Sequence, residues 1–181
     1  MKKTALMLAV FVFCAAMAFA QGTAIAGEWS SQDDTGDGGI STIAMSQVTV
    51  DGQAANRFVG QVKMGGYQWA YLNAIFTPNA DGKRAMGSAR AISFNVRGNG
   101  EKYWFSIATT DVKDWAYHRY SFETKVNETV RVRVPINLMR QPDWGLSRRL
   151  QLANTEEFRW TSFVSGAESA YDLTIWDLRY E

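Results

Sequence analysis

Hydrophobic and polar residues alternate along most of the chain with the period of two that is typical of strands. Runs rich in β-branched and aromatic side chains are separated by turn-forming residues, as at Asp51-Gly52 and Gly98-Asn99-Gly100. The predicted strands are Ile40–Val50, Asn56–Val62, Gln68–Phe76, Ala89–Val96, Tyr103–Thr109, Tyr117–Glu123, Val130–Val134, Phe158–Val164 and Tyr171–Tyr180. Short strands at this spacing predict an all-β fold, a jelly-roll β-sandwich of two antiparallel sheets.

The segment from Pro135 to Glu157 is the one long stretch without strand periodicity, and a short helix is predicted within it at Leu146–Leu150. The chain shows no internal repeat, no low-complexity tract and no linker. Residues 21–181 are therefore expected to form a single β-sandwich domain. A chain of roughly 160 residues buries about two-thirds of its unfolded surface, which suffices for one core.

Neighbouring side chains of a strand point to opposite faces, so each predicted strand has a core side and a water side. The valines of Val130–Val134 are predicted to lie in the core, with Arg131 and Arg133 on the water side. The run Tyr103-Trp104-Phe105 cannot be buried on one side, and Trp104 is predicted to point outward. The chain therefore has aromatic residues on a face that its core does not need.

Residues 1–20 are predicted to be a secretory signal peptide. Lys2 and Lys3 precede an apolar run that ends in Ala18-Phe19-Ala20, which is an A-x-A cleavage site. The run is short for a membrane span. Cys14 lies inside it after the bulky Phe13, so lipidation is not expected and the mature chain would hold no cysteine. We expect an exported protein, periplasmic or extracellular, that folds without disulfides.

The charge balance bears on the class of partner. Without the two lysines of the signal peptide, 17 basic residues stand against 18 acidic ones, a net charge of −1. Proteins that bind nucleic acid or anionic membrane surfaces usually carry a basic excess. Neither partner is expected here.

Aromatic residues and hydrogen-bonding side chains together form the candidate ligand site. Aromatic ring faces suit sugars, because C–H groups stack on the ring while the hydroxyls remain available for polar partners. The alternative for each ring is that it fills the core between the two sheets. The candidate ligand-binding residues are Tyr67, Trp69, Tyr71, Trp104, Trp115, Tyr117, His118, Arg119, Arg131 and Arg133.

An acidic, glycine-rich loop runs from Asp33 to Gly39 and contains Asp34 and Asp37. Calcium binds carboxylate and carbonyl oxygens, which such a loop can supply, although the spacing is not that of an EF-hand. A solvated turn ahead of the first predicted strand is the other interpretation.

Catalysis finds little support in the sequence. His118 is the single histidine, no G-x-S-x-G elbow is present, and no Cys/His cluster has the spacing of a zinc site. The carboxylates of Glu156-Glu157 and of Asp111 and Asp114 lie in predicted loops, with no reason to face each other as a glycosidase requires. We do not expect an enzyme.

Several motifs carry a family resemblance. The chain contains F-N-V-R-G-N-G-E-K-Y, then Y-S-F-E-T, then V-R-V-P, and it closes with I-W-D-L-R-Y; an opening D-D-x-x-x-G-G-I-S-T precedes them. The chain resembles the galactose-binding-like jelly rolls and is similar to the complex I intermediate-associated protein 30 family and to family 11 carbohydrate-binding modules. The similarity spans residues 28–181, essentially the whole mature chain.

The resemblance implies a β-sandwich with a non-catalytic binding or assembly role. In the carbohydrate-binding branch a concave sheet carries stacking tyrosines, often with a structural calcium ion. Trp176 stands where the first of two closing aspartates is typical, so only the second, Asp177, remains. The candidate metal ligands are therefore Asp33, Asp34, Asp37 and Asp177. We therefore expect an exported module that binds an oligo- or polysaccharide. The alternative is a periplasmic or envelope structural protein that binds a protein partner with the same face.

Overall fold

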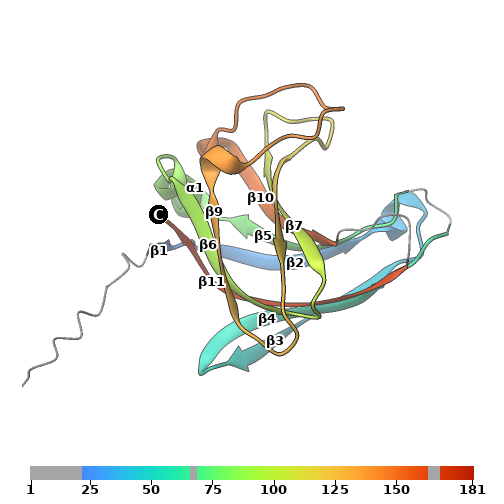
Figure 1. Cartoon of the computed structure of the whole chain (residues 1–181). Helices are drawn as coiled ribbons and strands as arrows, with labels where there is room; N and C mark the ends of the chain where they lie inside the picture. Colours follow the sequence, from blue (N-terminus) through green and yellow to red (C-terminus); the bar gives the residue numbers. More distant parts are fainter. Residues whose placement is uncertain (1–21, 66–68, 163–167) are drawn as a thin grey trace, which may run out of the picture.

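The computed structural model describes residues 22–65, 69–162 and 168–181 of the chain. The predicted signal peptide and the candidate residue Tyr67 lie outside these ranges. Figure 1 shows the described residues arranged as two sheets that face each other, with longer loops at the top and at the right of the view.

In each sheet five strands lie side by side, and all pairings between the strands are antiparallel. The first sheet has the order β3 (Thr42–Val50), β4 (Gln53–Val62), β11 (Ser169–Tyr180), β6 (Ala91–Gly98) and β9 (Val130–Pro135), with β1 (Thr23–Ala24) paired to the end of β11. The second sheet has the order β2 (Gly27–Asp33), β5 (Leu72–Pro78), β10 (Thr155–Ser162), β7 (Lys102–Thr109) and β8 (His118–Glu123). The predicted all-β sandwich of two antiparallel sheets is confirmed.

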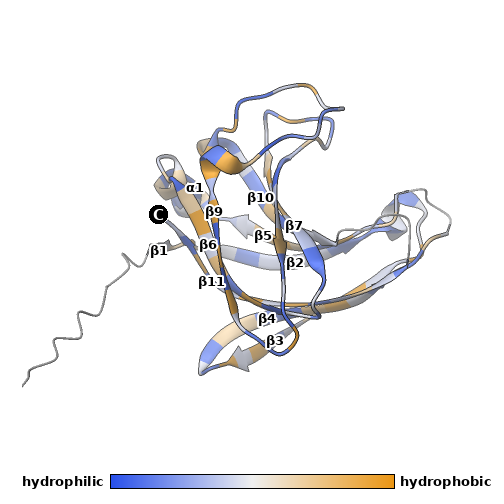
Figure 2. Cartoon of the chain, in the orientation of Figure 1, coloured by the Kyte–Doolittle hydropathy of each residue, from blue (hydrophilic) through white to orange (hydrophobic). Residues whose placement is uncertain are grey.

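The core lies between the two sheets and is rich in aromatic rings. Phe94 of the first sheet meets Phe105 and Trp160 of the second, with ring centroids 5.1 and 5.2 Å apart. Hydrophobic and polar positions alternate along β6, β9 and β11 (Figure 2). The predicted division into core and water sides holds for Val130–Val134 and for Tyr103-Trp104-Phe105, because the alternate residues are buried as expected.

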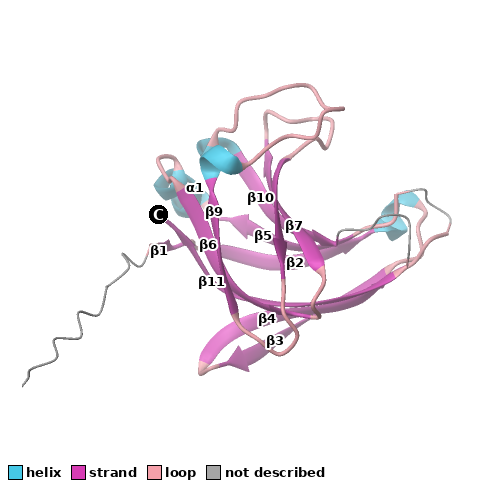
Figure 3. Ribbon diagram, in the orientation of Figure 1, coloured by secondary structure: helices cyan, strands magenta, loops and turns pink. Residues whose placement is uncertain are grey.

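Helical structure differs from the prediction. Leu146–Leu150 has no regular secondary structure; single 3₁₀ turns lie instead at Ile136–Leu138 (η2) and Leu152–Asn154 (η3) (Figure 3). An α-helix, α1, spans Ala80–Met86, between two predicted strands where no helix was expected. The Asn79 side chain caps it by accepting a hydrogen bond from Gly82 N at 2.9 Å. None of the helices that the structure describes is long and apolar enough to cross a membrane.

One buried hydroxyl connects the two sheets. Tyr171 of β11 donates its phenolic hydrogen to the backbone carbonyl of Trp160 in β10 at 2.7 Å and accepts from the backbone N–H of Ala74 in β5 at 3.3 Å. Ala74 and Trp160 are direct partners in the second sheet, so the hydroxyl bonds to both members of one cross-strand pair. Burial raises the pKa of Tyr171 well above its ordinary value, which keeps the hydroxyl protonated.

Candidate ligand-binding face

The outward face of the second sheet holds a continuous set of polar and aromatic side chains. Directly paired residues of antiparallel strands point to the same side, so the register identifies which residues share this face. One row across the five strands consists of Gln32, Asn73, Thr161, Trp104 and Ser121. The next row consists of Ser30, Ile75, Arg159, Ser106 and Arg119. We call this surface the second-sheet face.

Hydrogen bonds fix the polar side chains on the β2, β5 and β10 side of the second-sheet face. Thr161 Oγ1 donates to Asn73 Oδ1 at 2.6 Å, and Asn73 Nδ2 donates to Gln32 Oε1 at 3.3 Å. Arg159 Nη2 lies 2.8 Å from Glu157 Oε2. A network held in one arrangement loses little rotamer entropy when a ligand binds, which favours recognition.

Two cation–π pairs lie beside this network. The guanidinium carbon of Arg119 is 4.4 Å from the centre of the Trp104 ring, and that of Arg159 is 5.1 Å from the centre of the Tyr117 ring. Burial raises the pKa of Tyr117, so its hydroxyl remains a hydrogen-bond donor at neutral pH. On this face each of these two aromatic rings therefore has an arginine guanidinium packed against it.

A groove of about 420 Å³ borders the second-sheet face at its β8 edge. Trp104, Arg119 and Ser121 line one wall. The other wall comes from the connection between β9 and β10, which contributes Leu138, Arg140 and Asp143 among others. Sequence reasoning missed this second wall, because no local pattern shows that a loop from the end of the first sheet folds back along β8.

The β7–β8 loop and the β9–β10 connection meet at the top of Figure 1. The carboxylate of Asp114, in the β7–β8 loop, accepts a hydrogen bond from the backbone N–H of Leu146 at 2.7 Å. Their apolar side chains remain exposed: Trp115 is 74% exposed, Trp144 67% and Leu146 66%. Trp115 also has a φ of +59°, a left-handed conformation that a bulky side chain rarely adopts.

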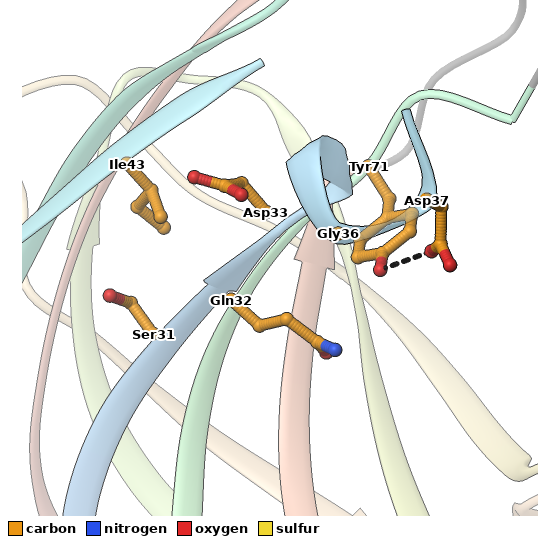
Figure 4. A pocket seen from close by; sticks show the side chains of 7 residues that line it. All are labelled: Ser31, Gln32, Asp33, Gly36, Asp37, Ile43 and Tyr71. Atoms are coloured by element: carbon orange, nitrogen blue, oxygen red, sulfur yellow. Dashed lines mark hydrogen bonds between the residues drawn. The ribbon is translucent and has the colours of Figure 1, made fainter. Parts of the chain in front are cut away.

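The residues before β5 lie at the opposite end of the sandwich from these loops. Trp69 and Tyr71 fall within the predicted strand Gln68–Phe76, but β5 begins only at Leu72. Trp69 is 68% exposed, and the Tyr71 hydroxyl donates to Asp37 Oδ2 at 2.8 Å. Figure 4 shows Tyr71 and Asp37 beside Gln32 at a shallow pocket of about 440 Å³.

Three other candidate residues do not lie on the second-sheet face. Arg131 and Arg133 point outward from β9 in the first sheet, on the far side of the sandwich, and are paired with Asp177 and Glu181 at 2.9 and 2.7 Å. His118 pairs with Ile107 and therefore faces inward, where it is only 7% exposed. The expectation of a single surface joining all ten candidates was wrong, because a sandwich has two outward faces.

The acidic loop is a structural element of the β2–β3 connection. Asp34 is fully buried, and its carboxylate accepts hydrogen bonds from Ser41 N at 2.9 Å, Ser41 Oγ at 2.7 Å and Tyr71 N at 3.3 Å. Asp33 caps the 3₁₀ turn η1 (Asp34–Asp37) by accepting from Thr35 N at 3.1 Å. A Cβ at Gly39 would lie 2.2 Å from the Asp34 carboxyl carbon, so this position requires glycine.

The four aspartates expected to bind metal do not come together. Asp177 lies near the C-terminal end of β11, where it is hydrogen-bonded to Arg131 and Arg179. The acidic loop lies near the other end of β11: Ser169 pairs with Val62, and the next residue, Lys63, donates its backbone N–H to Ser41 Oγ. Both Asp34 oxygens already accept hydrogen bonds from N–H or O–H donors. Within the described ranges, no group of three His, Cys, Asp or Glu side chains is placed to hold a metal ion. The predicted calcium ligands do not fit one shared site.

Solved structures that superpose on this chain include carbohydrate-binding modules and part of a larger enzyme. The family 11 carbohydrate-binding module of a cellulosomal cellulase of Clostridium thermocellum superposes with a TM-score of 0.62 at 13% identity, over 87% of this chain and 95% of that one. The solution structure of CtCBM11 gives 0.60 at 15% identity, over 91% and 97%. An exo-β-agarase gives 0.54 at 9% identity, over 88% of this chain but 25% of its own.

At these identities the likeness establishes the fold, a galactose-binding-like jelly roll, as the sequence predicted. No curated protein matches the chain in sequence. A family model matches residues 17–173, which is most of the chain, and its description is complex I intermediate-associated protein 30. The chain therefore belongs to the complex I intermediate-associated protein 30 family.

Proposed function

We propose that this protein is a non-catalytic carbohydrate-binding module and that the second-sheet face is its site. The observation that carries the proposal is the register of the second sheet, which brings Trp104, Arg119, Arg159 and the Gln32–Asn73–Thr161 network onto one surface. Stacking groups with fixed hydrogen-bonding partners are what sugar recognition requires. The shared fold with family 11 modules, over nearly their whole length, supports this function.

The described residues also support a role in binding rather than in catalysis. His118 faces the core, and burial lowers its pKa, so it is poorly placed to exchange protons with a ligand. On the second-sheet face the carboxylate of Glu157 is held in an ion pair with Arg159. Export is part of the proposal and rests on the sequence of residues 1–20 alone.

A glycan array tests the proposal with the purified protein and two variants. Trp104→Ala removes the stacking platform and should weaken binding about fivefold or more, since truncated aromatic anchors typically cost over about 1 kcal/mol. Trp144→Ala is the matched control, because it removes an exposed tryptophan that lies on a loop beyond the face. Thermal melts establish that both variants fold. An array without any bound glycan, measured with folded protein, would contradict the proposal.

The second candidate function is protein binding, and one observation favours it. Trp115, Trp144 and Leu146 are exposed together on two adjacent loops, and clustered exposed apolar residues mark interaction surfaces. Pull-down from an envelope fraction, with Trp144→Ala as the variant, tests this function. Loss of a captured protein in that variant alone, together with a blank glycan array, would favour the protein-binding function.

A further inference from the structure

Two arginines lie directly opposite each other at the β8 edge of the second-sheet face. The backbone N–H of Arg119 donates to the carbonyl of Arg140 at 2.9 Å, and the N–H of Arg140 donates back at 3.1 Å. The side chains of two residues paired in this way point to the same side of the sheet, with their Cβ atoms about 5 Å apart. Like charges at such positions repel each other and are destabilising unless another group compensates them.

No carboxylate in the described ranges forms an ion pair with either guanidinium. Arg119 lies over Trp104, while Arg140 Nη1 donates to the backbone carbonyls of Asn137 and Met139 at 2.7 and 2.8 Å. Asp143, the acidic residue of the groove wall, pairs with neither. The other arginines on the described strands all have a carboxylate partner: Arg57, Arg97, Arg131, Arg133, Arg159 and Arg179.

The groove brings these charges together with a stacking surface. Arg119, Arg140 and Trp104 line the same space of about 420 Å³, a volume within the range of small-ligand sites. A guanidinium presents its N–H donors in a planar fork that matches a carboxylate or a sulfate. Because Arg119 stacks on Trp104, its fork is held in place before a ligand arrives.

We propose that this groove selects glycans that carry an anionic group, either the carboxylate of a uronic acid or a sulfate ester. This inference rests on the proposed function and adds to it the charge of the ligand. The anionic oxygens would lie between Arg119 and Arg140 and relieve their repulsion, while the sugar ring lies against Trp104. The rest of the second-sheet face would bind the neighbouring sugar units.

The experiment measures binding of the full chain to an array that contains neutral β-glucans, uronic-acid oligosaccharides and sulfated oligosaccharides. Each acidic binder is then titrated beside its neutral counterpart, the methyl ester of a uronate or the desulfated form of a sulfate ester. The variants are Arg119→Gln and Arg140→Gln. Arg133→Gln is the control, since Arg133 is an exposed arginine on the opposite face of the sandwich.

Acidic glycans should bind more tightly than their neutral counterparts, and higher salt should reduce the difference. Arg119→Gln should weaken binding of the acidic glycan at least about tenfold, and by more than it weakens binding of the neutral counterpart, whereas Arg133→Gln should change neither. Arg119→Lys should restore only part of the loss, because an ammonium lacks the fork. The relative response of uronate and sulfate distinguishes the two sources of charge.

Equal binding of acidic and neutral glycans would overturn the inference and leave the proposed function intact. Acidic binding that survives in both Arg119→Gln and Arg140→Gln would also overturn it, because the charge would then be recognised elsewhere. No binding to any glycan would overturn the inference and the proposed function together. Because Arg140 also supports its own loop, a loss seen only in Arg140→Gln with a lowered melting temperature counts against the inference.

Discussion

The buried carboxylate of Asp34 should be one of the most sensitive single positions in the protein. It accepts hydrogen bonds from two backbone N–H groups and one hydroxyl, on Ser41 and Tyr71, and no solvent reaches it. In Asp34→Asn the amide nitrogen replaces one acceptor and faces donors, so at least one N–H or O–H group loses its partner. Each such buried loss costs about 1–3 kcal/mol, and the charge-assisted bonds that remain are weakened as well.

We expect a loss of about 3 kcal/mol for Asp34→Asn, which for a domain of this size lowers the melting temperature by about 6–12 °C. Thermal unfolding followed by circular dichroism measures the shift. Asp37→Asn is the matched control, since Asp37 is exposed and its side chain accepts a single hydrogen bond from the described residues, from the Tyr71 hydroxyl at 2.8 Å. It should change the melting temperature by no more than about 2 °C. If Asp34→Asn melted within 2 °C of the wild type, the argument that this carboxylate organises the loop would be refuted.

Three further predictions address metal, pH and strain. Chelation of calcium should leave the melting temperature unchanged, because the Asp34 oxygens are occupied by hydrogen-bond donors; a fall on adding chelator would show a calcium site in this protein. Stability should decrease as the pH falls through 6.5 and below, because burial lowers the pKa of His118 from its ordinary 6.5 and the unfolded chain therefore binds the proton first; His118→Gln should flatten this dependence in pH-resolved melts, and an unchanged slope would contradict the assignment. Trp115→Gly should raise the melting temperature by about 2–4 °C, since glycine adopts a φ of +59° without strain and the exposed indole contributes little packing; a lower melting temperature would mean that the ring is packed.

Strand periodicity predicted much of this fold from sequence, because alternation of apolar and polar residues fixes which side chains enter a core. It correctly placed Tyr103 and Phe105 inside and Trp104 outside. It missed β2 because Ser30-Ser31-Gln32 presents no alternating apolar side chain, and only Trp29 packs against the core. It missed α1 because a seven-residue helix that contains a glycine has too few apolar positions to show a helical period.

The candidate site was predicted only in part, for a geometric reason. Alternation distinguishes inward from outward but does not say to which of two sheets a strand belongs. Arg119 and Arg131 both follow the outward pattern, yet they lie on opposite sides of the sandwich. Asp34 and Asp177 are separated for the same reason, since the distance between two loops depends on strand order. Arg140 enters the site through a long-range bridge that no local pattern encodes.

The Tyr171 hydroxyl makes the shape of the proposed binding surface depend on a residue outside it. Because it bonds to the backbones of both Ala74 and Trp160, it fastens the far sheet to the two strands that carry Asn73 and Thr161. Replacing Tyr171 with phenylalanine would remove both bonds and leave packing alone to position β5 and β10 against the far sheet. For the proposed site, we therefore expect a second route to changed binding, through substitutions in the far sheet that never touch the ligand. A mutational scan restricted to contact residues would miss this route.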